Sequence, residues 1–402
     1  MRALIRPGVA RGELAAPPSK SMAHRLLICA ALARGDSVVR GVDRSEDVLA
    51  TLDCLKALGA DVRLEGDTAL VRGCDPARST PATLPCRESA GTLRFMIPLC
   101  LLSGRPMRLT GGEGLMRRPL SVYAEICRER SLRFEPDGLS LRVEGRLSPG
   151  GYRVPGDVSS QFVSGLLFAL PLLEGDSAIR LVPPVESRPY VDMTVHALRD
   201  FGVDVRWRDD LTLSVPGRAS FIPRDRTVEG DWSAAAVFEA LNCLGGDVRV
   251  TGLRDDSLQG DRVCRAYFRE LTRGPAALDV ADCPDLAPVL LALAAACHGG
   301  TLTGTRRLRY KESDRGEAMA RELARFGVAL QIRENEITVP AGRLHAPDGP
   351  LSSHGDHRVA MALAVLCART GGEIDGAEAV RKSLPDFWER LRSLGVGVTL
   401  LG

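Results

Sequence analysis

The sequence predicts an α/β protein with two similar domains, each built from three βαβ-like modules. Three observations support this fold class. The chain has 402 residues, too many for a single hydrophobic core. A pattern of polar opening, apolar helix, glycine-containing turn and short strand occurs six times. Between these copies, amphipathic helices run into glycine turns and alternating apolar residues, as in VDVRW from Val203, which is typical of half-buried strands.

The six apolar helices are expected to be buried, because almost every position in them is apolar. Their segments open at Ser21, Ser89, Ser159, Asp231, Pro284 and Gly355. The second helix of each module has a charged face and is expected to be exposed. The fourth module is expected to be short, since RAYFRELTRGPAALDV leads quickly to the fifth. An ordinary α/β fold with accidental internal similarity is the alternative.

Charge and hydropathy exclude several functional classes. The 53 basic and 51 acidic residues are interleaved, which argues against a general binder of nucleic acid or anionic membranes. The first twenty residues contain no apolar segment of signal-peptide length, and the longest apolar run, 286–297, is too short to cross a bilayer. We therefore expect a cytoplasmic protein, and any basic site must be local.

Cysteine and histidine spacing gives no indication of a metal site. The 11 cysteines include no C-x-x-C pair, and the six histidines include no H-E-x-x-H motif. Many of the cysteines fall inside apolar helical segments, as Cys29, Cys100 and Cys367 do. We expect reduced, buried thiols and no metal requirement.

Five of the six apolar helices open with small or charged residues that favour anion binding. A helix N-terminus presents unpaired backbone N–H groups and the positive end of the helix dipole. Ordinary capping by Ser or Asp would explain any one of these openings. Five together predict N-termini that converge on an inter-domain cleft for polyanionic ligands. The five segments are KSMAHR (20–25), ESAGTLR (88–94), SSQ (159–161), CPD (283–285) and GDHR (355–358).

The basic residues in these contexts are candidates for ligand binding. Only four of the 53 are lysines, and three of them, Lys20, Lys311 and Lys382, lie in dense polar motifs. A compact, titratable ammonium could not be replaced there by the planar fork of arginine. Lys56, on an amphipathic helix, is interpreted as a surface residue. Three arginines suit carboxylate or phosphate through paired hydrogen bonds: Arg118, Arg315 and Arg358.

Two acidic residues are candidates for proton transfer. Asp285 precedes an apolar helix, and Glu312 lies beside Lys311. Carboxylates near a lysine supply the neighbouring charge that tunes catalytic acids and bases. On the structural alternative, Asp285 only caps its helix and Glu312 is a salt-bridged surface group.

These residues and motifs together resemble the 3-phosphoshikimate 1-carboxyvinyltransferases, or EPSP synthases. The resemblance covers essentially the whole chain, and so many motifs in order are specific. A sister family that transfers the same group to a UDP-amino sugar typically has a Lys-Asn opening, whereas this chain has Lys20-Ser21. The matching motifs are PPSKSMAHR, AGTLRF, GLMRRPL, VSSQFVSGLL, SRPYVDMT, VEGDWSAAA, CPDLAP, KESDR, GDHRVAMALA and RKSLPDFW.

The resemblance implies the enolpyruvyl transferase fold. Its two domains each contain three βαβαββ repeats with buried parallel helices, an architecture of the inside-out α/β barrel type. One domain is expected to span residues 19–229. The other is expected to combine residues 1–18 with residues 230–402. Such domains would close on their substrates and exclude water.

The resemblance also implies a reaction and its residues. Phosphoenolpyruvate would donate its enolpyruvyl group to the 5-hydroxyl of shikimate 3-phosphate, releasing phosphate, in aromatic amino-acid biosynthesis. Asp285 would take the hydroxyl proton, and Glu312 with Lys20 would protonate the methylene, with no cofactor. Contacts to shikimate 3-phosphate would come from Lys20, Ser21, Arg25, Ser159, Ser160, Gln161, Ser187, Asp285 and Lys311. Contacts to phosphoenolpyruvate would come from Lys20, Ala90, Gly91, Arg118, Gln161, Arg315, Arg358 and Lys382.

The segment ESAGTLRF departs from the family pattern. Glu88 stands where Asn is common, and Ala90 takes the small-residue position facing phosphoenolpyruvate if Arg94 keeps its register. An extra methyl there predicts reduced sensitivity to the bulkier inhibitor glyphosate. Arg307, near a position that is often Asn, is left out of the predicted site.

Two alternatives to this function stay open at the level of sequence. One is transfer to a UDP-amino sugar. The other is an anion-binding relative without turnover, which the joint presence of Lys20, Asp285, Glu312 and Lys382 disfavours. We expect a monomer that binds the two small substrates and neither nucleic acid nor membrane.

Overall fold

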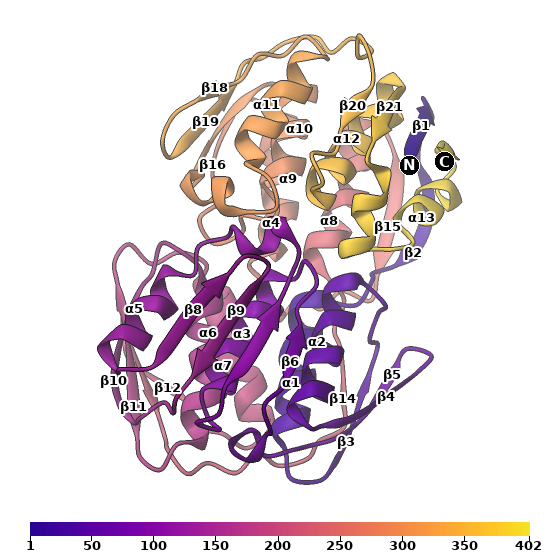
Figure 1. Cartoon of the computed structure of the whole chain (residues 1–402). Helices are drawn as coiled ribbons and strands as arrows, with labels where there is room; N and C mark the ends of the chain where they lie inside the picture. The colour runs from indigo at the N-terminus through magenta and orange to yellow at the C-terminus, as the bar shows by residue number, and fades with distance from the viewer. The chain divides into compact units, whose positions relative to one another are not determined.

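The computed structural model describes residues 1–402, which form two compact units. Unit 1 contains Met1–Pro17 and Gly230–Gly402, and unit 2 contains Pro18–Glu229. Each unit has its own hydrophobic core. Figure 1 shows the helices and strands of both units, coloured along the chain.

Unit 2 contains three four-stranded sheets with the same topology. In each sheet the first two strands are parallel and the last two join antiparallel, which is the βαβαββ pattern. The first sheet takes one edge strand, Arg226–Thr227, from the C-terminal end of the unit, so the two ends of the unit pair in one sheet. The strand orders are β14 (Arg226–Thr227), β3 (Asp36–Arg40), β5 (Thr68–Arg72), β4 (Asp61–Glu65); β6 (Thr83–Pro85), β7 (Met107–Thr110), β9 (Ser140–Glu144), β8 (Arg133–Asp137); and β10 (Gly150–Pro155), β11 (Ser177–Val182), β13 (Thr212–Val215), β12 (Arg206–Asp209).

The first helix of each unit 2 module is buried along almost its whole length. These helices are α1 (Lys20–Leu32), α3 (Ala90–Cys100) and α6 (Ser160–Ala169). All three contribute buried residues to the single core of the unit, and Figure 1 shows them among its sheets. The second helices, α2 (Glu46–Leu58), α5 (Ser121–Glu129) and α7 (Arg188–Asp200), bury only one face. Both results agree with the expected pattern of apolar and amphipathic helices.

Unit 1 contains two four-stranded sheets and one pair of strands. The pair belongs to the fourth module, which lacks the closing hairpin of the other modules, as expected from the short segment that leads to the fifth module. In the last sheet, β1 lies between β21 and β22 and is antiparallel to both. The strands are β2 (Arg11–Ala15) with β15 (Asp247–Thr251); β16 (Ala276–Asp279), β17 (Gly300–Thr303), β19 (Glu336–Val339), β18 (Gln331–Ile332); and β20 (Leu351–Ser352), β21 (Gly372–Asp375), β1 (Arg2–Arg6), β22 (Gly397–Leu401).

The buried helices of unit 1 are α8 (Trp232–Ala240), α10 (Ala287–Ala296) and α12 (His357–Thr370). Alanine and leucine dominate α10, so its turns pack closely against α12. Burying each large apolar side chain contributes about 1.5–3 kcal/mol, and Trp232 and Trp388 are among the largest in this core. The other helices are α9 (Cys264–Arg273), α11 (Arg315–Ala324) and α13 (Phe387–Ser393).

No helix of the chain is both long and apolar enough to cross a bilayer.

Helix capping follows the polar openings found in the sequence. Ser19, Ser89, Ser159, Asp231 and Asp356 each accept a hydrogen bond from a backbone N–H in the first turn of a buried helix. Helix α1 therefore begins at Lys20, one residue before the opening at Ser21 that the pattern indicated.

Candidate active site

In unit 1, the buried guanidinium of Arg315 is the centre of an ion cluster. Arg315 is the first residue of α11, and its side chain is 2% exposed. Its Nη1 donates to Asp285 Oδ1 at 2.7 Å, its Nη2 to Glu312 Oε2 at 3.1 Å, and its Nε to Asp356 Oδ2 at 2.8 Å. A planar fork can satisfy three carboxylates at once, which an ammonium could not do. The two predicted proton-transfer residues are thus brought together by one arginine.

Asp285 is not a helix cap. Helix α10 begins at Ala287, and Leu286 stands at its N-cap position without a side-chain bond. The carboxylate contacts Lys311 Nζ at 3.2 Å, and its second oxygen lies 3.9 Å from Arg358 Nη2. Burial works to raise the pKa of Asp285, but the charges of Lys311, Arg315 and Arg358 together hold it well below its usual value. The carboxylate is therefore ionised and can accept a proton.

The pKa of Lys311, next to Glu312, is also lowered, which makes its ammonium group easier to deprotonate. Burial lowers its pKa, and the charges of Arg315 and Arg307 add to this effect against the attraction of Asp285. The buried Arg307 donates from Nη2 to the carbonyl oxygen of Ala281 at 2.6 Å. Arg307, which the sequence analysis left out of the site, therefore supplies a positive charge that helps to lower the pKa of Lys311.

Glu312 lies between two cations and is not a surface group. Its side chain is 13% exposed, with Oε2 at 3.1 Å from Arg315 and Oε1 at 3.6 Å from Lys382 Nζ. Lys382 itself is 11% exposed. The lysine from the C-terminal motif RKSLPD and the carboxylate from KESDR therefore meet, as a shared ligand would require.

Arg358 is buried with little compensation from the protein. It follows the N-cap Asp356, which accepts from the Arg358 backbone N–H at 2.8 Å. The side chain is 5% exposed, and its Nε and Nη1 make no hydrogen bond. Buried charges are normally paired and hydrogen-bonded. A guanidinium in this state at a helix N-terminus is suited to an anionic ligand.

Unit 2 holds the other predicted site residues, beginning with Lys20 on the first turn of α1. Lys20 Nζ donates to Asp47 Oδ2 at 2.8 Å, and Asp47 belongs to the first turn of α2. The two side chains are 17% and 7% exposed. Asp47 thus holds the lysine at the beginning of both helices.

Arg25 is positioned by backbone and hydroxyl oxygens. Its Nε donates to Thr194 Oγ1 at 2.8 Å, Nη1 to the Ser21 carbonyl at 2.6 Å, and Nη2 to the Tyr190 carbonyl at 2.8 Å. Burial lowers the pKa of Arg25 to about 10, so it remains charged. Of the five N–H donors of a guanidinium, two are left for a ligand.

The N-termini of α3 and α6 lie side by side. Arg94 Nη1 donates to Gln161 Oε1 at 2.7 Å, which directs the amide nitrogen of Gln161 away from Arg94. A Cβ built on Gly91 would lie 3.6 Å from Gln161 Nε2. The predicted phosphoenolpyruvate residues Ala90, Gly91 and Gln161 are therefore neighbours within unit 2.

The remaining predicted residues of unit 2 also lie at helix starts or short loops. Ser159 caps α6 through the Gln161 N–H, and Ser160 is the first helical residue. Ser187 precedes α7 with φ of 58°, in the left-handed region that is uncommon for serine. Arg118 follows α4 (Glu113–Met116) in a half-buried loop.

With this geometry in place, comparisons with known proteins identify the family. The family model for EPSP synthase (3-phosphoshikimate 1-carboxyvinyltransferase) matches residues 6–391. The chain belongs to the EPSP synthase family. The 3-phosphoshikimate 1-carboxyvinyltransferase of Clostridium kluyveri is 39% identical, with 97% of this chain and 96% of that protein covered. Its namesake from Clostridium perfringens is 36% identical, with 98% of each covered.

Solved structures agree on the fold. Two EPSP synthase structures from Acinetobacter baumannii align with TM-scores of 0.79 and 0.80. They cover 99% and 100% of this chain at 24% and 23% identity. The predicted fold class is confirmed, with separate small sheets in place of a closed barrel.

Three residues that the EPSP synthase motifs did not single out take part in these clusters. Asp356, fully buried, binds Arg315 and caps α12. Asp47 binds Lys20, and Arg94 orients Gln161. Asp356 lies in the motif GDHRVAMALA and Arg94 in AGTLRF, so membership in a motif was the signal that could have identified them as site residues. Asp47 had no sequence signal beyond an acidic residue in a first helical turn.

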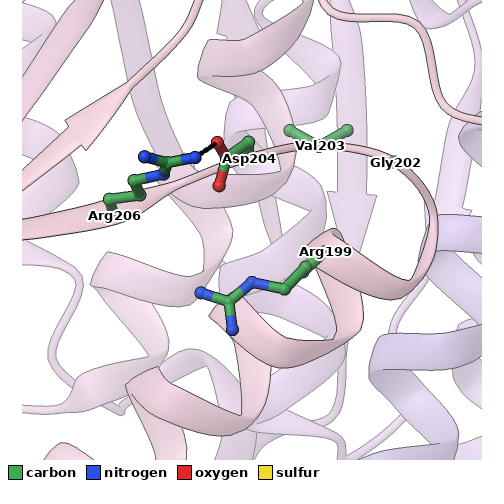
Figure 2. Close-up of a pocket in the computed structure, with 5 residues that line it drawn as sticks. All are labelled: Arg199, Gly202, Val203, Asp204 and Arg206. Carbon is green, nitrogen blue, oxygen red and sulfur yellow. Dashed lines mark ion pairs between the residues drawn. The ribbon is translucent and has the colours of Figure 1, made fainter.

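A separate hollow in unit 2 contains none of the predicted site residues. It has a volume of about 420 Å³ and is lined by residues from the end of α7 to β12. In Figure 2, Arg206 pairs with Asp204, while Arg199 extends from the helix. Both arginines are exposed, and the only buried residue in the lining is the apolar Val203. We assign it no role.

Proposed function

We propose that this chain performs the reaction of its family through the residues described above. The enolpyruvyl group of phosphoenolpyruvate is transferred to the 5-hydroxyl of shikimate 3-phosphate, and phosphate is released. The observation that carries the proposal is the state of Arg358, a buried cation with two nitrogens unpaired beside Asp285, Arg315 and Lys311. A substrate with carboxylate and phosphate groups supplies the missing anions.

The binding roles divide by unit. In unit 1, Arg315, Arg358 and Lys382 bind phosphoenolpyruvate, whereas Lys311 and Asp285 bind shikimate 3-phosphate. In unit 2, Lys20 and Gln161 contact both substrates. The remaining contacts to shikimate 3-phosphate are Ser21, Arg25, Ser159, Ser160 and Ser187, and those to phosphoenolpyruvate are Ala90, Gly91 and Arg118.

The proton steps follow from charge. Asp285, ionised through its cation partners, accepts the proton of the 5-hydroxyl while that oxygen attacks C2 of phosphoenolpyruvate. Glu312, with Lys20, delivers a proton to C3, which becomes a methyl group in a tetrahedral adduct. The adduct then loses a C3 proton to Glu312 and Lys20, the C2–O bond to phosphate breaks as Asp285 returns its proton to the departing phosphate, and the C2–C3 double bond reforms. Orientation and charge neutralisation by the arginines and lysines lower the barrier.

A low pKa makes Asp285 a weak base in the unliganded protein. Substrate anions that attract Lys311 and Arg358 would reduce the positive field on Asp285 and raise its basicity. The proposal therefore couples substrate binding to activation of the base.

The test is release of inorganic phosphate from phosphoenolpyruvate with shikimate 3-phosphate, and in parallel with UDP-N-acetylglucosamine. We expect release with shikimate 3-phosphate only, and its loss in Lys20→Ala and Asp285→Ala. Lys56→Ala, an exposed lysine on α2, is the matched control and should keep full activity. Release with the UDP-sugar alone would instead assign the chain the sister reaction, and no release with either would indicate a binder.

A further inference from the structure

The segment that precedes α12 is held at both ends by one helix. At its far end, Asp356 binds Arg315, the first residue of α11. At its near end, Ser352 and His354 bind Glu322, seven residues further along α11. Two helical turns separate Arg315 and Glu322, which places both side chains on one face. Neither Glu322 nor His354 belongs to the proposed binding or proton-transfer groups.

Glu322 is a buried carboxylate whose hydrogen bonds go to the segment before α12. The residue is 3% exposed. Its Oε2 accepts from the Ser352 backbone N–H at 3.0 Å, and its Oε1 lies 2.8 Å from His354 Nε2. Arg325 Nε, at 3.8 Å, is the other charge beside it. An ionised carboxylate only accepts hydrogen bonds, so Nε2 of His354 carries a hydrogen.

The segment needs such support because its backbone is irregular. The strand β20 has two residues and lies at the edge of its sheet. The backbone N–H of Ser352 points away from the sheet and is bonded by the Glu322 carboxylate in place of a neighbouring strand. His354 and Gly355 follow with φ of 51° and 67°, two consecutive left-handed residues. This conformation is unfavourable for histidine and persists only where surrounding contacts impose it.

We infer that Glu322 and His354 are positioning residues that fix the turn at 352–356 and thereby the places of Asp356 and Arg358. Asp356 forms the α12 cap and the Arg315 pair, so a shift of the turn moves two phosphoenolpyruvate-binding arginines relative to each other. The inference rests on the proposed function for its kinetic consequence only. The hold of α11 on the turn is independent of the reaction.

The kinetic test compares His354→Phe with His354→Gln. A glutamine amide can donate from the place of Nε2, whereas phenylalanine cannot. We expect His354→Phe to raise KM for phosphoenolpyruvate about tenfold, as small misplacements of binding groups do. KM for shikimate 3-phosphate and kcat should change less than threefold. His354→Gln should restore most of the lost affinity.

His345→Phe is the matched control, since His345 is exposed in the same unit and its side chain bonds only to the carbonyl of Ala346. It should behave as wild type. The inference is overturned if His354→Phe lowers the unfolding midpoint but leaves both KM values unchanged, because the pair would then be purely structural.

Amide hydrogen exchange tests the hold itself without any substrate. In Glu322→Gln, peptides covering residues 350–358 should exchange about tenfold faster than wild type, with little change in peptides from α10. Unchanged protection at 350–358 would refute the inference. Failure of the wild type to release phosphate would refute the proposed function. The exchange result would then decide by itself whether Glu322 fixes the turn.

Discussion

At the residue scale, the two buried arginines of unit 1 differ in how the protein satisfies them. Arg315 is bonded to three carboxylates, while Arg358 has two nitrogens without partners. A buried charge that is well paired supports the fold, and removing it strands its partners. A buried charge that is poorly paired is held for a ligand at the expense of stability. The same substitution should therefore mainly reduce stability at Arg315 and mainly weaken substrate binding at Arg358.

Replacing each arginine with methionine tests this contrast. We expect Arg315→Met to lower the free energy of unfolding by about 3–5 kcal/mol, because three carboxylates lose their partner. Arg358→Met should change it by less than about 1 kcal/mol, since no strong bond is broken, yet raise KM for phosphoenolpyruvate at least tenfold. Denaturant unfolding and steady-state kinetics measure both effects. Equal destabilisation by the two substitutions would contradict this view of Arg358.

His24 gives a second prediction at this scale. Burial lowers its pKa to about 3, and its Nδ1 is 2.7 Å from Thr51 Oγ1. In the unfolded chain the pKa is about 6.5. Because the folded value is the lower one, the unfolded state gains protons first, and stability falls as the pH drops from about 6.5 toward 3. The loss amounts to about 2 kcal/mol at pH 5.

The variant His24→Asn should remove this dependence. Its side chain can occupy the place of Nδ1 and keep the bond to Thr51, but it does not titrate. Native-state hydrogen exchange of α1 peptides at pH 7 and pH 5 gives the difference between the two proteins. A wild-type protein that loses no more stability than the variant would show that His24 is protonated when folded.

At the scale of elements, the starts of the buried helices place the polar groups. Helix α3 begins with Ala90 and Gly91, and its neighbour α6 presents Gln161 beside Gly91. Ala90 is 6% exposed, so it is part of the packed surface of this helix start. Single methyl groups at such positions decide which ligand fits.

Removing that methyl should change inhibitor discrimination. We expect Ala90→Gly to lower the glyphosate inhibition constant about tenfold while KM for phosphoenolpyruvate changes less than threefold, since one methyl contributes roughly 10- to 200-fold in discrimination. Inhibition kinetics against phosphoenolpyruvate give both numbers. Gly91→Ala is the counterpart, because its Cβ makes only ordinary contacts, the nearest at 3.6 Å, and should be tolerated structurally. No change in inhibition with Ala90→Gly would assign the discrimination elsewhere.

At the scale of the molecule, each unit closes with a strand that is distant in sequence. Unit 2 takes β14 from its own C-terminal end to complete the sheet of β3. Unit 1 takes β1 from the N-terminus as an inner strand of its last sheet. The two core clusters contain residues of one unit each. Each unit therefore has its own complete sheets and its own core, as an independent folding unit does.

A fragment of residues 18–229 should consequently fold alone. We expect cooperative urea unfolding by circular dichroism, with α/β secondary structure as in the full chain. A fragment of residues 18–220 lacks β14 and should be less stable, because the edge of β3 loses its parallel partner. A non-cooperative transition for 18–229 would show that unit 2 needs unit 1 to fold.

The sequence alone determined the features that depend on short-range periodicity and residue type. Apolar and amphipathic helices, the six modules and the shortened fourth module follow from patterns within about twenty residues. The chemical types of Lys20, Asp285, Glu312 and Arg358 and the order of the motifs were enough for family membership, which the comparisons confirm. The roles of individual residues remain predictions.

Only the tertiary structure decided which of these groups meet. Arg315 binds Asp285, 30 residues away, and Asp356, 41 residues away, and no local pattern encodes either pair. The same holds for Lys20 with Asp47, for β14 and β1 in distant sheets, and for Glu322 with the turn at 352–356. Periodicity records which face of an element is apolar, whereas ion pairs and sheet edges depend on where the folded chain brings remote segments.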